Sequence, residues 1–116
     1  MNRFEAEKRG RRGEAIAAWF LRLQGWRIVG ERIKTPRGEV DLIVRRGKTV
    51  AFVEVKARTK RPDLATAIDA YRLRRVAAAA EILLPKYGKG TENMRIDVIL
   101  VAPWRWPHHL RNVWHR

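Results

Sequence analysis

Residues 38–58 read GEVDLIVRRGKTVAFVEVKAR, and this stretch decides the fold. Residues 39–45 alternate in the manner of a strand, and residues 49–58 make the strongest strand pattern of the chain. The turn at Gly47 between them predicts a β-hairpin. Both strands also place acidic side chains in otherwise apolar runs, which is costly inside a sheet unless the charge is paired or binds a metal. The apolar side of the first strand is expected to hold Val40, Leu42 and Val44.

Helical periodicity marks two further segments. Residues 4–24 predict a helix that ends at Gly25, and residues 63–84 predict a second helix with Asp63 as its N-cap. The stripe expected to face the core in the first helix is Ile16, Phe20 and Leu23, with Gly13 and Ala17 on the same side. In the second helix the expected stripe is Leu64, Ile68, Tyr71, Ala78 and Ile82.

Short β-prone runs predict the remaining strands. They cover residues 26–33 and 94–101, with a loop at residues 85–90 and a short extra strand near residues 110–114. The order is therefore α-β-β-β-α-β, which predicts an α/β fold with a mixed central sheet of four or five strands flanked by helices. The 116 residues are expected to form a single domain, 1–116, with a Trp- and His-rich C-terminal tail at 103–116.

The chain is strongly basic. It has 26 Lys and Arg against 12 Asp and Glu, a formal net charge of +14, and the surplus is spread along the sequence. This favours a folded domain with a basic face and a polyanionic partner, with nucleic acid ahead of a membrane surface. There is no apolar run long enough to span a membrane and no signal-peptide pattern. The absence of cysteine excludes disulfides and agrees with a cytoplasmic location.

Asp41, Glu54 and Lys56 are the candidate catalytic residues. Glu54 and Lys56 are two positions apart on one strand, so their side chains point to the same face, and one register of the hairpin places Asp41 beside Glu54. Two carboxylates suit Mg²⁺ or Mn²⁺, which would lower the pKa of a water and polarise a phosphate. Lys56 would orient that water or stabilise developing negative charge. These groups suit phosphodiester hydrolysis, whereas an ordinary exposed ion pair is the plainer alternative.

The same residues carry a family resemblance. Asp41, 13 residues before Glu54, together with Glu54-Val55-Lys56 resembles the PD-(D/E)xK signature of restriction endonuclease-like nucleases, with Val40 in place of the proline. Across nearly the whole chain, the sequence resembles the bacterial YraN-like family. The matching blocks are GE at 13–14, GEVDLI at 38–43, FVEVKAR at 52–58 and RIDV at 95–98.

The resemblance implies a restriction endonuclease-like fold similar to archaeal Holliday junction resolvases. It also implies a divalent-metal site made by Glu14, Asp41 and Glu54, with Lys56 as the catalytic lysine, and a homodimer. Two positions depart from the family pattern: Arg32 stands where Asn is usual, and Arg72 where Lys is usual. We expect these departures to affect substrate contacts more than metal binding.

Other polar residues have two readings each. Glu39 shares a strand face with Asp41 and either supports the metal ligands or faces solvent. Asp97 is expected to form an ion pair with Arg95 or Arg58. Trp104, Trp106 and Trp114 either stack on bases or cover one end of the sheet. The three His are expected to be ordinary tail residues, and the residues expected to contact nucleic acid are Arg11, Arg12, Arg37, Arg58, Arg72 and Arg75.

The expected function is that of a Mg²⁺-dependent DNA endonuclease that acts on branched or structured DNA such as Holliday junctions. One alternative is a non-catalytic nucleic-acid-binding protein that retains the nuclease fold. Another is a small basic protein that docks on RNA or a ribonucleoprotein. Metal-dependent cleavage distinguishes the first from the other two, and preference for RNA over DNA distinguishes the third.

Overall fold

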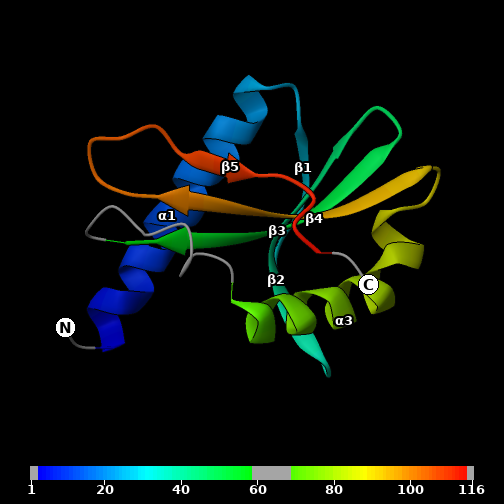
Figure 1. Ribbon diagram of the computed structural model, residues 1–116, viewed down its shortest axis with the longest axis horizontal. Coiled ribbons are helices and arrows are strands. Elements are labelled where there is room, and N and C mark those ends of the chain that lie inside the picture. Colours follow the sequence, from blue (N-terminus) through cyan, green and yellow to red (C-terminus); the bar gives the residue numbers. More distant parts are fainter. Residues whose placement is uncertain (1–2, 59–68, 115–116) are drawn as a thin grey trace.

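A five-stranded sheet lies between two helices (Figure 1). The structure, a computed structural model, describes residues 3–58 and 69–114, and within them the side chains of residues 8, 10–58 and 69–114. Strand order in the sheet follows the sequence. The elements are α1 (Arg3–Leu23), β1 (Arg27–Thr35), β2 (Gly38–Arg46), β3 (Thr49–Ala57), α3 (Ala70–Tyr87), β4 (Asn93–Val101) and β5 (His108–Leu110).

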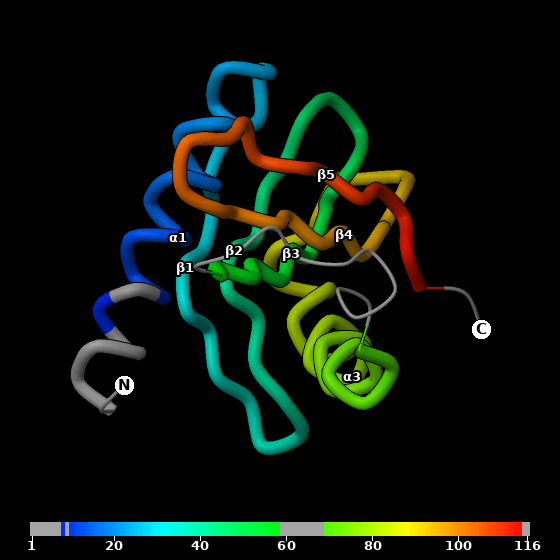
Figure 2. The backbone as a smooth tube through the Cα atoms, turned by 60° about the vertical axis from the view of Figure 1, so that its left-hand side comes forward, coloured from blue at the N-terminus to red at the C-terminus, as the bar shows by residue number. Residues whose placement is uncertain are grey.

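Strand β3 is the centre of the sheet. It pairs antiparallel with β2 and parallel with β4, while β1 and β5 are antiparallel edge strands. The parallel pair is connected through α3, which covers one face of the sheet, and α1 covers the other (Figures 1 and 2). The predicted hairpin, the mixed sheet and the order α-β-β-β-α-β are confirmed. The extra strand is β5, at residues 108–110 and not at 110–114.

Two apolar layers form the core, one on each face of β3. Phe52 packs in the layer under α3 and Val53 in the layer under α1, because successive side chains of a strand point to opposite faces. On β2 this alternation is interrupted. Val40 lies under α3, whereas Leu42 and Val44 lie under α1, so the prediction that all three share a face was wrong.

Helix α1 faces the sheet with its small residues. Gly13, Ala17 and Ala18 are buried, and an added β-carbon at Gly13 would lie 2.7 Å from Cβ of Ala57. Such a close approach of helix to strand leaves no room for large side chains. The predicted core stripe was therefore wrong in part, because Ile16 is 42% exposed and Leu23 is 62% exposed.

Helix α3 packs through Leu73, Val76, Ala79 and Ala80, while Tyr71 and Ile82 of the predicted stripe are exposed. Asp69 is its N-cap and accepts hydrogen bonds from the backbone amides of Tyr71 and Arg72. The predicted cap Asp63, with Leu64 and Ile68, lies outside the described residues.

The end of α3 also differs from the prediction. The helix continues to Tyr87 through Pro85, where a loop was expected. A proline lacks the amide that would bond to the carbonyl four residues earlier, but in the last turn only this one bond is lost. The Gly88 amide still donates to the Leu84 carbonyl and closes the turn.

Candidate functional site

The candidate site lies where β2 and β3 separate. Their regular pairing ends at Leu42 and Val53, and beyond this point the β1–β2 hairpin bends away from β3 (Figure 1). Asp41 stands at the opening. Its Oδ2 accepts a hydrogen bond of 2.8 Å from the backbone amide of Val55, so a carboxylate takes the place of a strand carbonyl.

The opening contains a small hollow of about 100 Å³, which we call the carboxylate hollow. Glu39, Asp41 and Glu54 line it from the two strands. The residues that line it from α3 are Tyr71, Arg72, Arg75 and Val76. Asp41 and Glu54, 13 residues apart in the sequence, are thus brought together as the hairpin pattern predicted, and Glu39 is beside them.

Glu54 is almost completely buried, with a side chain that is only 3% exposed. Arg72 Nε donates to Glu54 Oε1 at 2.5 Å. The other oxygen, Oε2, is buried and has no hydrogen-bond partner among the described residues. A buried carboxylate oxygen without a donor is costly, so this atom is open to a ligand that supplies positive charge.

A glycine brings α3 close enough to place its arginines at the hollow. A β-carbon at Gly38 would overlap the backbone carbonyl of Arg75, so only glycine allows this contact between β2 and α3. Arg72 and Arg75 consequently lie beside the acidic side chains. Arg75 is exposed and lines the hollow.

Glu14 reaches the same region from α1. Its Oε1 accepts a hydrogen bond of 2.6 Å from Arg32 Nε, and its side chain is 19% exposed. This bond, with the charge of Glu14, raises the pKa of Arg32. Arg32 has a φ of 50°, an unusual left-handed backbone for a residue with a side chain. Its neighbours Glu31 and Ile33 pair with Leu42 and Val40, the residues on either side of Asp41.

The environment of Asp41 favours its protonated form. Burial raises the pKa of Asp41 to about 6, and the negative charges of Glu14 and Glu54 act in the same direction. The Val55 amide and the positive charge of Arg72 oppose this rise. The pKa of Asp41 therefore lies closer to neutral pH than that of an ordinary carboxyl group, because its negative charge is poorly compensated.

Lys56 lies beside this arrangement. It is buried on the same face of β3 as Glu54, and its side chain forms no hydrogen bond or ion pair with another described residue. It is not among the residues that line the hollow. The structure therefore places Lys56 on the correct face, one strand repeat beyond Glu54.

The acidic groups fit a hard cation only in part. In the described part of the chain, no three His, Asp or Glu side chains are arranged to hold a metal ion. Two of the acidic side chains are already paired with arginines, Glu14 with Arg32 and Glu54 with Arg72. Asp41 and the unpartnered Oε2 of Glu54 nevertheless form a two-carboxylate set that suits Mg²⁺ or Mn²⁺ with water completing the shell.

The arginines expected to contact nucleic acid do not form one surface. Arg72 and Arg75 lie at the carboxylate hollow, whereas Arg12 and Arg58 line a separate groove beside α1. Arg11 is exposed on α1, and Arg37 is 3.8 Å from Glu81 in an exposed ion pair.

A second cluster of charged residues holds the C-terminal segment to the sheet. Asp97 is fully buried and accepts hydrogen bonds from Arg95, from His109 at 2.7 Å and from the Asn112 amide. The predicted pair of Asp97 with Arg95 is confirmed. His109 was missed, because nothing in the sequence near this tail residue indicates a buried partner. These contacts hold the pKa of Asp97 below its usual value, even though burial acts to raise it.

A solved structure shares the fold. The solved structure of Archaeoglobus fulgidus Hjc, a Holliday junction resolvase from an archaeal hyperthermophile, is similar with a TM-score of 0.61 over 86% of this chain and 73% of that chain, at 20% identity. The chain therefore has the restriction endonuclease-like fold that its motifs predict.

The chain belongs to the family described as "Uncharacterised protein family UPF0102", which matches residues 13–101, and the predicted YraN-like membership is confirmed. The UPF0102 protein of Rhizorhabdus wittichii is 73% identical over 113 residues, which cover 97% of this chain and 96% of the relative. That of Sphingopyxis alaskensis is 61% identical over 114 residues and 98% of each chain. Among the described helices, none is both long and apolar enough to cross a membrane.

Proposed function

We propose that this protein is a metal-dependent DNA endonuclease that hydrolyses phosphodiester bonds in branched or structured DNA such as Holliday junctions. The observation that carries the proposal is the unpartnered, buried Oε2 of Glu54 in a hollow shared with Asp41. The net charge of +14 and the fold shared with a protein described as a Holliday junction resolvase support a DNA substrate.

The residues of the hollow have distinct roles in this proposal. Asp41 and Glu54 would hold Mg²⁺ or Mn²⁺, and Glu14, now paired with Arg32, would be a third ligand. A divalent cation held there supplies a Lewis acid beside the phosphodiester. Lys56 orients the attacking water or stabilises negative charge at the phosphate, and Arg72 and Arg75 contact the DNA backbone.

The test is cleavage by purified protein in Mg²⁺ or Mn²⁺ of labelled four-way junctions, flaps and single strands. Asp41→Asn and Glu54→Gln are expected to abolish cleavage while circular dichroism shows an unchanged fold. Glu31→Gln, an exposed acid on β1, is the matched control and should cut like the wild type. Equal cleavage by the wild type and both hollow variants would show that a contaminant cuts, and would refute the proposal.

One observation favours a second candidate, a non-catalytic nucleic-acid-binding protein. The guanidinium groups of Arg32 and Arg72 already neutralise Glu14 and Glu54, as they would in a fold that has kept its charges without using a metal. This candidate predicts salt-sensitive DNA binding with no cleavage in any divalent metal.

Two further points belong to the proposal. A homodimer would present two hollows, one for each strand to be cut at a two-fold junction, and light scattering of the purified protein tests it. A cytoplasmic location, where bacterial DNA lies, agrees with the absence of cysteine.

A further inference from the structure

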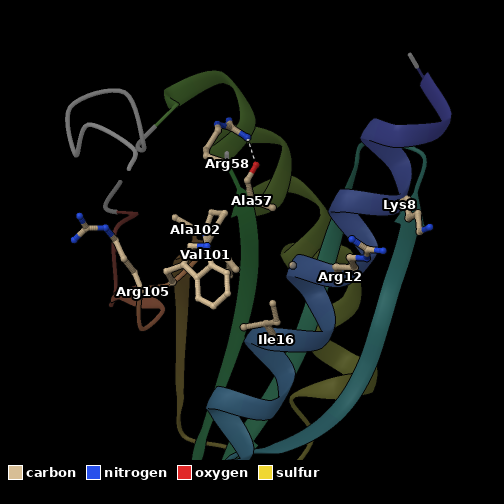
Figure 3. A pocket seen from close by; sticks show the side chains of 11 residues that line it. Lys8, Arg12, Ile16, Ala57, Arg58, Val101, Ala102 and Arg105 are labelled. Carbon is tan, nitrogen blue, oxygen red and sulfur yellow. Dashed lines mark hydrogen bonds between the residues drawn. The ribbon is translucent and has the colours of Figure 1, made fainter. Parts of the chain in front are cut away.

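A second concave surface lies beside α1, near the ends of β3 and β4. It is a groove of about 570 Å³, larger than the carboxylate hollow and on the other side of the sheet from α3 (Figure 3). Its floor is apolar and consists of Ile16, Ala57, Val101, Ala102 and Pro103.

Cations surround this apolar floor. Figure 3 shows Lys8 and Arg12 on the α1 side, Arg105 on the opposite side and Arg58 at the end of β3. No acidic residue of the described chain lines the groove, and none of the four cations forms an ion pair with a described acidic side chain. Among the described residues, the groove therefore combines an apolar surface with cations that no acidic side chain pairs.

Aromatic side chains are displayed at the same place. Trp104 lines the groove, is fully exposed and has a φ of 61°. Trp106, two residues further, is 72% exposed and stacks on Trp19 with ring centroids 5.8 Å apart. A large apolar side chain that is left in water on a left-handed backbone contributes little to the fold, which points to a role in binding.

We propose that this groove binds an unpaired strand of nucleic acid, with a base on the apolar floor against Trp104 and the flanking phosphates on Lys8, Arg12, Arg58 and Arg105. Proteins that hold single strands combine stacking aromatic rings with a basic channel, and both features are present here. Charge complementarity selects a polyanion, and the apolar floor distinguishes an unpaired strand, whose base is free to leave the stack, from a duplex.

The groove and the carboxylate hollow open on opposite faces of the sheet, and both lie toward the C-terminal end of β3. Gly13 lines the groove and precedes Glu14, while Ala57 lines it and follows Lys56. Glu54 of the hollow and Ala57 of the groove are three positions apart on β3, which is about 10 Å at about 3.3 Å per residue. The inference deepens the proposed function, on which its link to cleavage rests: the preferred substrate carries an unpaired strand beside the cut.

Binding without divalent metal tests the groove independently of cleavage. The probes are a fluorescein-labelled oligothymidylate and a blunt duplex, measured by fluorescence anisotropy in EDTA. Trp104→Ala is expected to weaken oligothymidylate binding by about five- to a hundredfold. Trp104→Phe retains most of the affinity because the ring can still stack. Arg105→Ala reduces the salt dependence of single-strand binding by about one phosphate contact.

The matched control is Arg27→Ala, which removes an exposed cation from the far end of β1 and should leave single-strand binding unchanged. The inference is overturned if Trp104→Ala binds oligothymidylate like the wild type, or if it weakens duplex binding equally. It is also overturned if the variant loses binding to anionic phospholipid vesicles and keeps binding to the oligonucleotide.

The two proposals fail separately. If the protein binds oligothymidylate through Trp104 but cuts no substrate, the proposed role of the groove in binding stands and the endonuclease proposal is refuted. If the Trp104→Ala variant cuts junctions as well as the wild type does, the endonuclease proposal stands and the proposed role of the groove is refuted.

Discussion

Arg72 and Glu54 form an ion pair between α3 and β3 in which one partner is half exposed and the other is buried. Nε of Arg72 is 2.5 Å from Oε1 of Glu54, with side-chain exposures of 53% and 3%. A partly solvated arginine thus reaches in from α3 to contact a carboxyl group that is buried at the centre of the sheet.

Removal of this arginine is expected to destabilise the metal-free protein. Arg72→Gln leaves the Glu54 charge without its cation and lowers the free energy of unfolding by roughly 1–3 kcal/mol, measured by urea denaturation in EDTA. Arg74→Gln, on the exposed side of the same helix, is the control and should change stability by less than about 0.5 kcal/mol. If the two variants are equally stable, the pair contributes nothing.

Gly38 sets the distance between α3 and β2. In Gly38→Ala the new methyl group overlaps the Arg75 carbonyl, so α3 must move, and a loss of about 2–4 kcal/mol in unfolding free energy is expected. Gly10→Ala is the opposite control. Nothing lies within 4 Å of its β-carbon in the helix α1, so alanine should stabilise the protein by up to about 1 kcal/mol. A neutral Gly38→Ala would contradict the packing described.

The Asp97 cluster predicts that the free energy of unfolding decreases in acid. Because the pKa of Asp97 is lowered in the folded state, its stabilising effect is present above the unfolded pKa and is lost as pH falls through the folded pKa. Asp97→Asn is expected to lose about 2–4 kcal/mol at pH 7, since its bonds to Arg95 and His109 lose their charge. The difference from the wild type should narrow below about pH 4. A constant difference over this range would exclude the charge as its cause.

Asp41 predicts the reverse pH dependence. Its folded pKa of about 6 lies above the ordinary value of 3.8, so the folded state binds this proton more tightly. The contribution of Asp41 to the free energy of unfolding is fully present below about pH 4 and is lost as pH rises through about 6. Asp41→Asn keeps an acceptor for the Val55 amide, so in EDTA at pH 8 it should be more stable than the wild type by roughly 1–3 kcal/mol. Lower stability of the variant at pH 8 would contradict this assignment.

The hairpin and its acidic residues could be predicted from the sequence because their signals are local. Strand alternation, the Gly47 turn and the position of Asp41 relative to Glu54 all lie within residues 38–58. The core face of α1 could not be predicted in the same way. Periodicity of large apolar residues selects Ile16 and Leu23, but the close approach of α1 to β3 selects small side chains instead.

The ion-pair partners of the acidic residues could not be predicted from local sequence patterns either. Arg32 and Glu14 are 18 residues apart in the sequence, and so are Arg72 and Glu54. Each pair joins a helix to a strand, so its formation depends on how the helices pack and not on spacing within one element. The sequence marked both arginines as unusual for the family, but it did not show that they face the predicted metal ligands.

The contact between Asp41 and Val55 makes one backbone signal a direct reporter of the hollow. The Val55 amide proton is held by the carboxylate of Asp41, so its nuclear magnetic resonance shift follows the ionisation of that single side chain. Titration of an isotopically labelled sample therefore reads the state of Asp41 without a mutation. Addition of Mg²⁺ to the same sample would show at this one amide whether the carboxylate has met a cation.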